Sequence, residues 1–424
     1  MEAQVDVAVA GGGAAGFFAA LHAKAAAPQA RVVILEKSRE FLAKVAISGG
    51  GRCNVTHDCM DPARLIQFYP RGGRELRGPF HRFQPRDTVE WFTSRGVALK
   101  TEADGRIFPV SDDSGDIVRT LLREAERLDV RLNPLQGVRH AEAVDGGFVL
   151  QLTDDTRLRC RVLILATGGN RGSGGLEVAA ALGHSIIEPV PSLFSFHVQS
   201  PMLQGLAGVS VPQVTVRIPE LGAASAGPLL ITHQGLSGPA ILKLSAWQAR
   251  AFAARRDAVD LEINWMGDLR EDSLRQQLEA QRRSAGGRLV TRTPMGEIPR
   301  RLWERLCHLS GIPETQTWAR LTAPQRDQLQ LHLLRAPCAM NGKTMNKEEF
   351  VTCGGVSLKE VDLRRFASRL HENLFFAGEI LDIDGVTGGF NFQAAWTGGF
   401  LAGTAAGEAW RRVRGAGGAL KVEG

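Results

Sequence analysis

The residues that could do chemistry appear first as glycines at a fixed spacing. From Gly11 the chain reads Gly-Gly-Gly-Ala-Ala-Gly, which contains the pattern G-x-G-x-x-G. In this pattern Gly11 permits a tight turn, Gly13 lets a pyrophosphate approach the backbone, and Gly16 lets a helix pack closely on a strand. The N–H groups at the start of that helix, including those of Ala14 and Ala15, then face the phosphates. The spacing therefore predicts a dinucleotide site.

An acidic residue completes this pattern. Glu36 follows the apolar run Val32–Leu35 and lies twenty residues beyond Gly16, with Lys37 next to it. A carboxylate at that position accepts hydrogen bonds from the ribose hydroxyls of adenosine and repels a 2′-phosphate. The sequence therefore predicts FAD or NAD, rather than NADP, at this site.

A second glycine-rich loop is predicted to contact the same cofactor. Three consecutive glycines end at Gly51 and continue into Arg52, Cys53 and Asn54, with Ser48 just before them. Such a run does not continue a regular element, and its backbone can come very close to a flat or anionic group. We interpret it as a further part of the dinucleotide site.

A third glycine-rich turn, near the C-terminus, favours a flavin over a nicotinamide. Gly389 opens a predicted helix, whose first N–H groups would stabilise the negative charge that develops on an isoalloxazine ring when it takes a hydride. The side chains of Asn391 and Gln393 are candidate donors to the ring, with capping and turn formation as the alternative. Glu379 and Asp384 would hold the ribityl hydroxyls or order the loop.

These loops need elements that bring them to one place. A strand, a helix and a second strand up to residue 36 form a βαβ unit, and the run 161–165 predicts another buried parallel strand that leads into Thr167 and Gly168. Because the carboxyl ends of parallel strands meet at one edge of a sheet, the turns that follow them come together there. A helix is predicted at 116–128, with Asp116 as its N-cap.

The middle of the chain has a different pattern and is predicted to be an inserted domain. Short alternating strands begin near residue 189, and charged helical segments follow at about 268–334. The predicted division is a first part of the cofactor domain at 1–190, the insertion at 191–345, a second part at 346–414 with a closing helix at about 391–411, and a loose tail at 415–424.

Two residues are candidates for catalysis. The Cys53 thiol, beside an arginine and loop N–H groups, could be activated, and a packed structural thiol is the alternative. His233 lies in a turn of the inserted domain and could exchange a proton near neutral pH, with a hydrogen-bonded turn histidine as the alternative. The six cysteines show neither C-x-x-C nor metal-ligand spacing, so no metal site is predicted.

Composition narrows the classes of partner. The net charge of +6 over 424 residues comes without a dense Lys/Arg run interleaved with aromatic residues, so nucleic acid is not favoured. The first strand begins within five residues of Met1, and no apolar run is long enough to span a bilayer. These features predict a cytoplasmic protein that acts on a small molecule, without a membrane partner, and they leave the oligomeric state open.

The motifs together resemble the bacterial FAD flavoproteins labelled aminoacetone oxidase-like or BaiN-type NAD(P)/FAD-dependent oxidoreductases. The resemblance rests on residues 11–16, 36–37, 47–56, 232–240, 376–379 and 384–393. It implies an α/β fold with an FAD-binding Rossmann-like domain of the two-dinucleotide-binding type, interrupted by a β-barrel-like domain with a helical subdomain. It also implies flavin chemistry on a small molecule, either amine oxidation or enone reduction.

Two positions depart from the family pattern. Phe390 stands where the family often has Tyr, and the segment 168–175 is shorter than its usual counterpart. Motifs and resemblance together predict that the cofactor is bound by Gly11, Gly13, Ala14, Ala15, Gly16, Glu36, Lys37, Lys44, Ser48, Gly51, Arg52, Cys53, Asn54, Thr167, Gly168, Gly378, Glu379, Asp384, Gly389, Phe390, Asn391 and Gln393.

The predicted function is that of an FAD-dependent oxidoreductase, which transfers a hydride between flavin N5 and a small organic substrate. The chain lacks a second G-x-G-x-x-G in its own domain, so NADH or NADPH would bind transiently at the flavin or not be used. A flavin-dependent tRNA-modifying enzyme and a non-catalytic flavin redox sensor are the alternatives. The sequence leaves open the substrate and the electron donor or acceptor.

Overall fold

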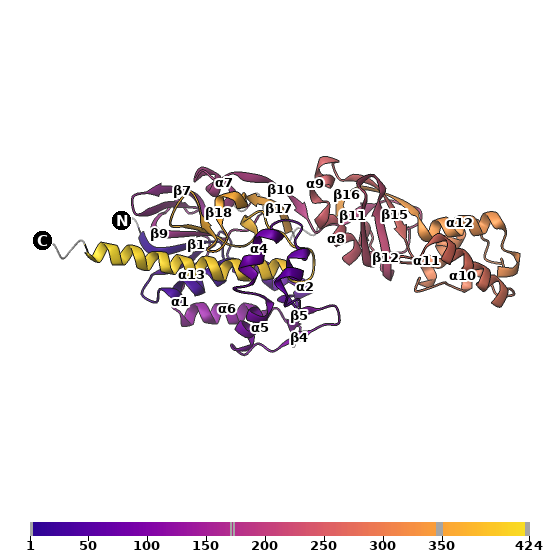
Figure 1. The fold of residues 1–424 in the computed structure, drawn as a ribbon, viewed down its shortest axis with the longest axis horizontal. Helices are drawn as coiled ribbons and strands as arrows, with labels where there is room; N and C mark the ends of the chain where they lie inside the picture. Colours follow the sequence, from indigo (N-terminus) through magenta and orange to yellow (C-terminus); the bar gives the residue numbers. More distant parts are fainter. Residues whose placement is uncertain (1–2, 170–171, 173, 345–350, 420–424) are drawn as a thin grey trace. The chain divides into compact units, whose positions relative to one another are not determined.

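The chain divides into two compact units, which are drawn in Figure 1. The computed structural model describes residues 3–169, 172, 174–344 and 351–419. The first unit comprises Met1–Pro191 and Lys347–Gly424, and the second comprises Ser192–Asn346. The first unit is therefore built from both ends of the chain.

A nine-stranded sheet forms the centre of the first unit. Its strand order is β18-β19-β20-β9-β1-β2-β6, and the hairpin of β7 and β8 joins it through β9. β1 pairs in parallel with β2 and β9, and β9 pairs in parallel with β20. The strands are β1 (Ala3–Ala10), β2 (Val32–Leu35), β6 (Arg131–Asn133), β7 (Val138–Val144), β8 (Gly147–Leu152), β9 (Arg157–Leu165), β18 (Val361–Asp362), β19 (Ala367–Ser368) and β20 (Leu374–Phe376).

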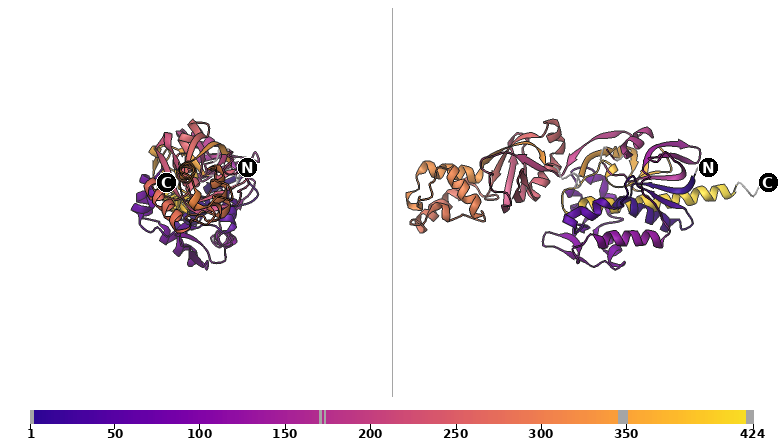
Figure 2. Two further views of the ribbon diagram at one scale, coloured as in Figure 1. Left: turned by 90° about the vertical axis from the view of Figure 1, so that its right-hand side faces the viewer. Right: turned by 180° about the vertical axis from the view of Figure 1, so that it is seen from behind.

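The apolar runs of the sequence become the buried core of this sheet. All four residues of β2 and the last four of β9 are buried, as expected for parallel strands covered on both faces. Three long helices, α1 (Ala14–Ala26), α6 (Gly115–Arg127) and α13 (Phe390–Ala419), lie together on one side of the sheet in Figure 1, and Figure 2 shows them from behind.

Shorter elements complete the first unit. A small sheet is formed by β3 (Thr56–His57), β4 (Leu99–Thr101) and β5 (Arg106–Pro109), and another by β10 (Ile186–Ser192) and β17 (Val351–Val356). The helices are α2 (Ala43–Gly51), α3 (Pro62–Leu65), α4 (Gly73–Phe80), α5 (Pro85–Thr93) and α7 (Gly175–Ala181).

Helices α1 and α13 pack so closely that only glycine fits along α13. A Cβ atom added at Gly399 would lie 2.7 Å from the carbonyl oxygen of Ala15, and one at Gly407 would lie 2.6 Å from that of Ala23. Gly403 meets the carbonyl group of Ala19 in the same way. Because the paired residue numbers rise together, the two helices run parallel, and α13 begins about 12 Å before the start of α1 along their common direction.

The second unit contains a closed antiparallel barrel with a helical extension. The barrel order is β11-β14-β13-β12-β15-β16. Its strands are β11 (Ser195–Val198), β12 (Ser210–Ile218), β13 (Ala223–Ile231), β14 (Gly235–Ser237), β15 (Ala258–Asn264) and β16 (Ala336–Thr344). Its helices are α8 (Pro239–Trp247), α9 (Ala249–Ala254), α10 (Glu271–Ser284), α11 (Arg300–Leu309) and α12 (Ala323–Leu334). The predicted helical segment at 268–334 thus corresponds to α10–α12.

Several local predictions were wrong. Helix α6 is preceded by Ser114 as N-cap, and Asp116 lies inside its first turn. Helix α13 continues to Ala419, so residues 415–419 belong to the helix, while 420–424 lie outside the described residues. The sequence reading missed β13, whose run Ala-Ala-Ser-Ala-Gly-Pro has weak strand propensity and forms a strand by pairing with β12.

The helices of the described ranges include none that is both long and apolar enough to cross a bilayer.

The α1–α13 contact yields a stability prediction. We expect Gly403→Val to destabilise the first unit by about 1–3 kcal/mol or more, because the added methyl groups overlap the α1 backbone. Thermal unfolding followed by far-UV circular dichroism should show a melting temperature lowered by several degrees. Gly287→Val is the matched control, since nothing lies within 4 Å of a Cβ atom there. Equal melting temperatures for the two variants would contradict the predicted role of the contact.

Candidate functional site

Four glycine- or acid-bearing turns meet at the carboxyl edge of the parallel sheet. The turns follow β1 at Gly11, β2 at Glu36, β9 at Thr167 and β20 at Gly378. The pairing of these strands puts Ala10 level with Leu35 and Leu165, and Leu165 level with Phe376. The sheet therefore brings together predicted site residues that are separated by more than 300 positions in the chain.

The three glycines of the first turn have different surroundings. Gly11 has φ +107° and lies against the carbonyl group of Ala166, while Gly16 lies against the carbonyl oxygen of Gly11. A side chain would collide at either position. Nothing lies within 4 Å of a Cβ atom added at Gly13, so the space beside it is open.

Free backbone donors border this open space. The first hydrogen bond of α1 runs from the N–H of Phe17 to the carbonyl oxygen of Gly13, at 3.0 Å. Within the described part of the chain, the N–H groups of residues 14–16 have no acceptor. A cradle without a Cβ atom, lined by donors at the positive end of a helix, fits a pyrophosphate.

The carboxylate of Glu36 is held in place by backbone donors. Its Oε2 accepts a hydrogen bond from the N–H of Gly12 at 2.7 Å, and its Oε1 accepts from the N–H and hydroxyl of Ser38 at 2.9 and 2.6 Å. The remaining lone pairs stay available for ribose hydroxyls. The carboxylate borders a small cleft lined by Gly11, Leu35, Glu36, Lys37, Gly137, Val138 and Thr167.

Two residues of this cleft were missed by the sequence analysis. Gly137 and Val138 lie where β7 begins, and a Cβ atom at Gly137 would lie 2.5 Å from the Cβ of Lys37. The signal in the sequence is a single glycine before a strand, which is too common to identify a ligand contact.

The second glycine loop has the irregular backbone that its sequence predicts. Gly49, Gly50 and Gly51 have φ values of +59°, +69° and +84°, and Ser48 leaves the helical region with ψ 148°. Nothing lies within 4 Å of a Cβ atom at Gly50 or Gly51. This loop therefore exposes bare backbone to a ligand, as the first turn does.

The side chains of this loop point to protein partners. Arg52 donates to Glu102 at 2.7 Å and lies over the ring of Phe108, 4.1 Å from its centroid. Cys53 is fully buried, and burial raises the pKa of its thiol to about 12. A thiolate is therefore disfavoured at neutral pH, which favours the alternative of a packed structural thiol.

The start of α13 also presents free backbone donors. The Asn54 amide, oriented with its oxygen toward α13, accepts from the N–H of Gly389 at 2.9 Å and donates to the carbonyl oxygen of Thr56 at 3.0 Å. The first helical bond runs from the N–H of Gln393 to the carbonyl oxygen of Gly389. Within the described ranges, the N–H groups of residues 390–392 have no acceptor.

The structure favours the alternative interpretation of Asn391 and Gln393. Asn391 accepts from the N–H of Gly385 at 2.8 Å and donates to its carbonyl oxygen at 2.9 Å. Gln393 is buried, and its Oε1 accepts from the hydroxyls of Thr56 and Thr88 at 2.6 and 2.9 Å. Both side chains hold the loop and helix in place, which favours capping and turn formation, and their donation to a flavin stays a prediction.

Charged residues of the closing loop are paired in a similar way. Asp384 is fully buried and forms a bidentate ion pair with Arg71, a partner that the sequence analysis missed. Asp384 therefore orders the loop, which was one of its two predicted roles. Lys44 contacts Glu379 at 3.0 Å, which links the second glycine loop to the turn after β20.

Phe390 belongs to a stack of rings. It is 2% exposed and lies parallel to Phe68, with ring centroids 4.3 Å apart, and close to His57 at 4.7 Å. The Tyr69 hydroxyl donates to the Phe390 carbonyl oxygen at 2.6 Å. Burial lowers the pKa of His57, whose Nδ1 accepts from the N–H of Cys59 and whose Nε2 lies 3.1 Å from a carbonyl oxygen. Both ring nitrogens of this histidine are thus engaged by protein groups, and the Asp58 carboxylate also lies 3.2 Å from its Nδ1.

The remaining predicted residues are placed as follows. Gly168 and Gly378 both have positive φ values, +79° and +76°. The side-chain nitrogen of Lys37 donates to the carbonyl oxygen of Gly172 at 2.5 Å. His233 lies exposed between β13 and β14 in the second unit. Residues 170, 171 and 173 of the shortened segment lie outside the described residues.

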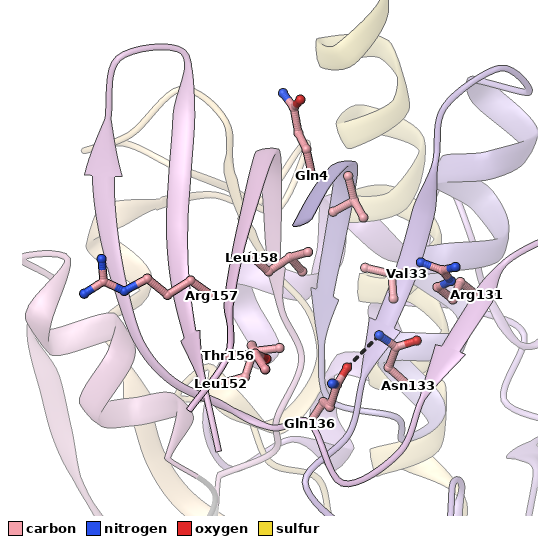
Figure 3. Close-up of a pocket in the computed structure, with 10 residues that line it drawn as sticks. Gln4, Val33, Arg131, Asn133, Gln136, Leu152, Thr156, Arg157 and Leu158 are labelled. Carbon is pink, nitrogen blue, oxygen red and sulfur yellow. Dashed lines mark hydrogen bonds between the residues drawn. The ribbon is translucent and has the colours of Figure 1, made fainter. Parts of the chain in front are cut away.

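A larger cavity of about 730 Å³ lies over another part of the sheet, and Figure 3 shows the residues around it. It is lined by residues of β1, β2 and β6 and of the β8–β9 hairpin, among them Gln4, Val33, Asn133 and Leu158. Asn133 donates to Gln136 at 2.7 Å. No residue predicted to bind the cofactor lines this cavity.

The chain matches the model of a known protein family and is similar to several known proteins. The model of the family described as the HI0933-like protein Rossmann domain matches residues 5–405. A ribosomal RNA dihydrouridine synthase of Escherichia coli is 31% identical over 92% of this chain and 95% of its own length. A 3-dehydro-bile acid delta(4,6)-reductase of Clostridium scindens is 27% identical over 95% of this chain and 99% of its own.

Solved structures support the fold. The chain is similar to a 3-ketosteroid-delta4-(5alpha)-dehydrogenase of Rhodococcus jostii, with a TM-score of 0.50 and 15% identity over 96% of this chain and 97% of that one. The chain is also similar to a 3-ketosteroid delta1-dehydrogenase of Sterolibacterium denitrificans. The TM-score is 0.51 and the identity is 12%, over 96% of this chain and 100% of that one. The predicted fold class, an FAD-binding Rossmann α/β domain with an inserted barrel, is confirmed.

The open space at Gly13 leads to a prediction for cofactor retention. We expect Gly13→Val to fold, because nothing in the protein occupies the position of the new side chain, and to purify without flavin, because a pyrophosphate can no longer approach. Visible absorption and the melting temperature of the apoprotein measure the two effects separately. A variant that is as yellow as the wild type would refute the phosphate-loop assignment.

The fixed carboxylate of Glu36 leads to a second prediction. We expect Glu36→Ala to weaken FAD binding by about 1–3 kcal/mol, since ribose hydroxyls lose their acceptor. Titration of apoprotein with FAD, followed by flavin fluorescence, gives the dissociation constant. Glu40→Ala removes an exposed acid from the same loop and should leave the affinity unchanged. Equal affinities for both variants would mean that the adenosine lies elsewhere.

Proposed function

The chain belongs to the HI0933-like Rossmann family of FAD-dependent oxidoreductases, and on that basis we propose that it reduces uracil bases in RNA to dihydrouracil. The observation that carries the proposal is the 31% identity, over nearly the whole chain, to a ribosomal RNA dihydrouridine synthase. Composition alone did not favour nucleic acid, and this relative is the reason to propose it.

The two kinds of relative share one type of chemistry. The double bond of uracil between C5 and C6 is conjugated with the C4 carbonyl, and the bonds named in a 3-dehydro-bile acid delta(4,6)-reductase are conjugated with a 3-oxo group. In both substrates a hydride adds to the carbon of the double bond that is remote from the carbonyl group. A proton adds to the other carbon of that double bond. Of the two reactions expected from the sequence, the relatives support reduction rather than amine oxidation.

The residues of the site fit this chemistry. When bound, FAD supplies the hydride to the substrate. The free N–H groups at the start of α1, with Gly13, would hold its pyrophosphate, and Glu36 would hold its ribose. The free N–H groups at the start of α13 would stabilise negative charge on the ring system.

The predicted candidates for the proton donor are Cys53 and His233. The pKa of the Cys53 thiol is raised by burial, which disfavours exchange of its proton near neutral pH. His233 lies exposed on a loop of the barrel unit, and its role as a proton donor stays a prediction.

The source of electrons completes the proposal. The sequence contains one G-x-G-x-x-G pattern, so we propose that NADH or NADPH donates a hydride in a transient complex at the flavin. The reaction then balances, since one hydride and one proton enter for each double bond that is reduced.

The test is an anaerobic absorption titration of the purified protein with NADH and then NADPH. We expect the flavin band to bleach, and to return when a uridine-containing ribosomal RNA fragment is added, with dihydrouridine detected by mass spectrometry of the digested RNA. The matched control is the same fragment with its uridines already reduced.

Other outcomes distinguish the alternatives. Recovery of the band with a steroid 4,6-dien-3-one, but not with RNA, would favour a small-molecule enone reductase, as the Clostridium relative suggests. Bleaching without recovery by any acceptor would favour a redox sensor. A protein that cannot be reconstituted with FAD would contradict the whole proposal.

A further inference from the structure

Positive charge is concentrated in one segment of the second unit. Residues 268–335 contain twelve arginines, no lysine and eight acidic residues, so this segment carries a net charge of +4 out of +6 for the whole chain. The remaining residues are close to neutral. The small net charge of the whole chain therefore comes mainly from one basic segment, residues 268–335.

Most of these arginines are not neutralised by the protein. Four of them contact a carboxylate: Arg275, Arg300, Arg326 and Arg335. Arg301 and Arg305 donate to backbone carbonyl oxygens of residues 205 and 201. In the described ranges the other six form no ion pair, and all six side chains are exposed.

Four of the unpaired arginines lie on two segments that are hydrogen-bonded to each other. Arg282 and Arg283 end α10, Arg288 follows in the next turn, and Arg320 ends the short helix Trp318–Arg320. The N–H of Trp318 donates to the carbonyl oxygen of Arg288 at 3.0 Å. The N–H of Ala319 donates to the carbonyl oxygen of Gly286 at 2.9 Å. We call Arg282, Arg283, Arg288 and Arg320 the arginine cluster.

The backbone segments that carry the arginine cluster are held by two buried tryptophans. Trp318 is fully buried, and its indole N–H donates to the hydroxyl of Thr293 at 2.6 Å. The indole N–H of the buried Trp303 donates to the carbonyl oxygen of Val290 at 2.7 Å. The backbones that carry the arginines are thereby fixed, while the guanidinium groups remain exposed.

Folding alone does not account for this arrangement. The C-terminal dipole of α10 stabilises Arg282 and Arg283, but Arg288 and Arg320 lie outside that helix. Unpaired like charges repel one another and oppose the compact state. The phosphate groups of a nucleic acid backbone would relieve this repulsion, because they carry negative charge. Each guanidinium group can also form two parallel hydrogen bonds with a phosphate.

We propose that the arginine cluster is the surface on which the RNA substrate docks through its phosphate backbone. The inference rests on the proposed action on RNA. The tryptophans of this region are buried, so the cluster offers charge rather than rings on which bases stack. Binding at the cluster is therefore independent of base sequence and strongly dependent on salt.

The test compares two full-length variants that lose the same charge. One carries Arg282→Gln, Arg283→Gln, Arg288→Gln and Arg320→Gln. The matched control carries Arg275→Gln, Arg300→Gln, Arg326→Gln and Arg335→Gln, which removes four paired arginines from the same segment. The probe is a short fluorescein-labelled single-stranded RNA of mixed sequence, and its anisotropy is measured over a range of KCl concentrations.

We expect the cluster variant to bind this RNA at least about tenfold more weakly than the control variant, with a salt slope smaller by about 2–3, which corresponds to four lost phosphate contacts. Both variants should keep the flavin content and the rate of bleaching by NADH or NADPH of the wild type. Equal affinity and equal slope for the two variants would overturn the inference, and so would wild-type protein that does not bind the RNA.

The outcomes separate this inference from the proposed reaction. Selective loss of RNA binding by the cluster variant, without any dihydrouridine formed by the wild type, would keep the docking surface and overturn the reaction. Dihydrouridine formation at the same apparent affinity by both variants would keep the reaction and overturn the docking surface. Competition by poly-glutamate as effective as by unlabelled RNA, at equal charge, would overturn the RNA assignment in favour of an acidic protein partner.

Discussion

The site depends above all on the contact between the backbones of α1 and α13. Three glycines of α13 lie directly against carbonyl groups of α1, so the two helices are closer than side chains would permit. The helices run parallel and begin about 12 Å apart along their common direction. In the described ranges, two sets of N–H groups without a protein acceptor are thereby presented toward the same sheet edge. One helix comes from the start of the chain and the other from its end.

Most polar side chains near the site are used to hold loops rather than ligands. Asn391 binds Gly385, Gln393 binds two threonine hydroxyls, and Asp384 binds Arg71. Buried polar groups need such partners, because an unsatisfied one costs about 1–3 kcal/mol. The predicted contacts to a ligand are therefore mainly backbone N–H groups and Glu36.

The net charge of the whole chain and the pairing of its individual charged side chains also lead to different conclusions. A net charge of +6 over 424 residues suggested an ordinary surface, and on that basis nucleic acid was not favoured. The ion pairs reveal that acids neutralise arginines unevenly. Among the described residues, the four exposed guanidinium groups of the arginine cluster have no carboxylate partner. Whether a charge is free is a property of the folded chain, because its partner is seldom its neighbour in sequence.

The sequence by itself determined the α/β class, the βαβ unit with its glycine turn and Glu36, and the presence of an inserted β-rich domain. These features are encoded locally, in apolar runs, glycine spacing and an acid at a fixed distance. Only the tertiary structure decided that β13 and β16 close a barrel, that Gly137 and Val138 line the Glu36 cleft, and that Cys53 is buried. The physical reason is that pairing, burial and desolvation depend on residues brought together from distant parts of the chain, which no local pattern records.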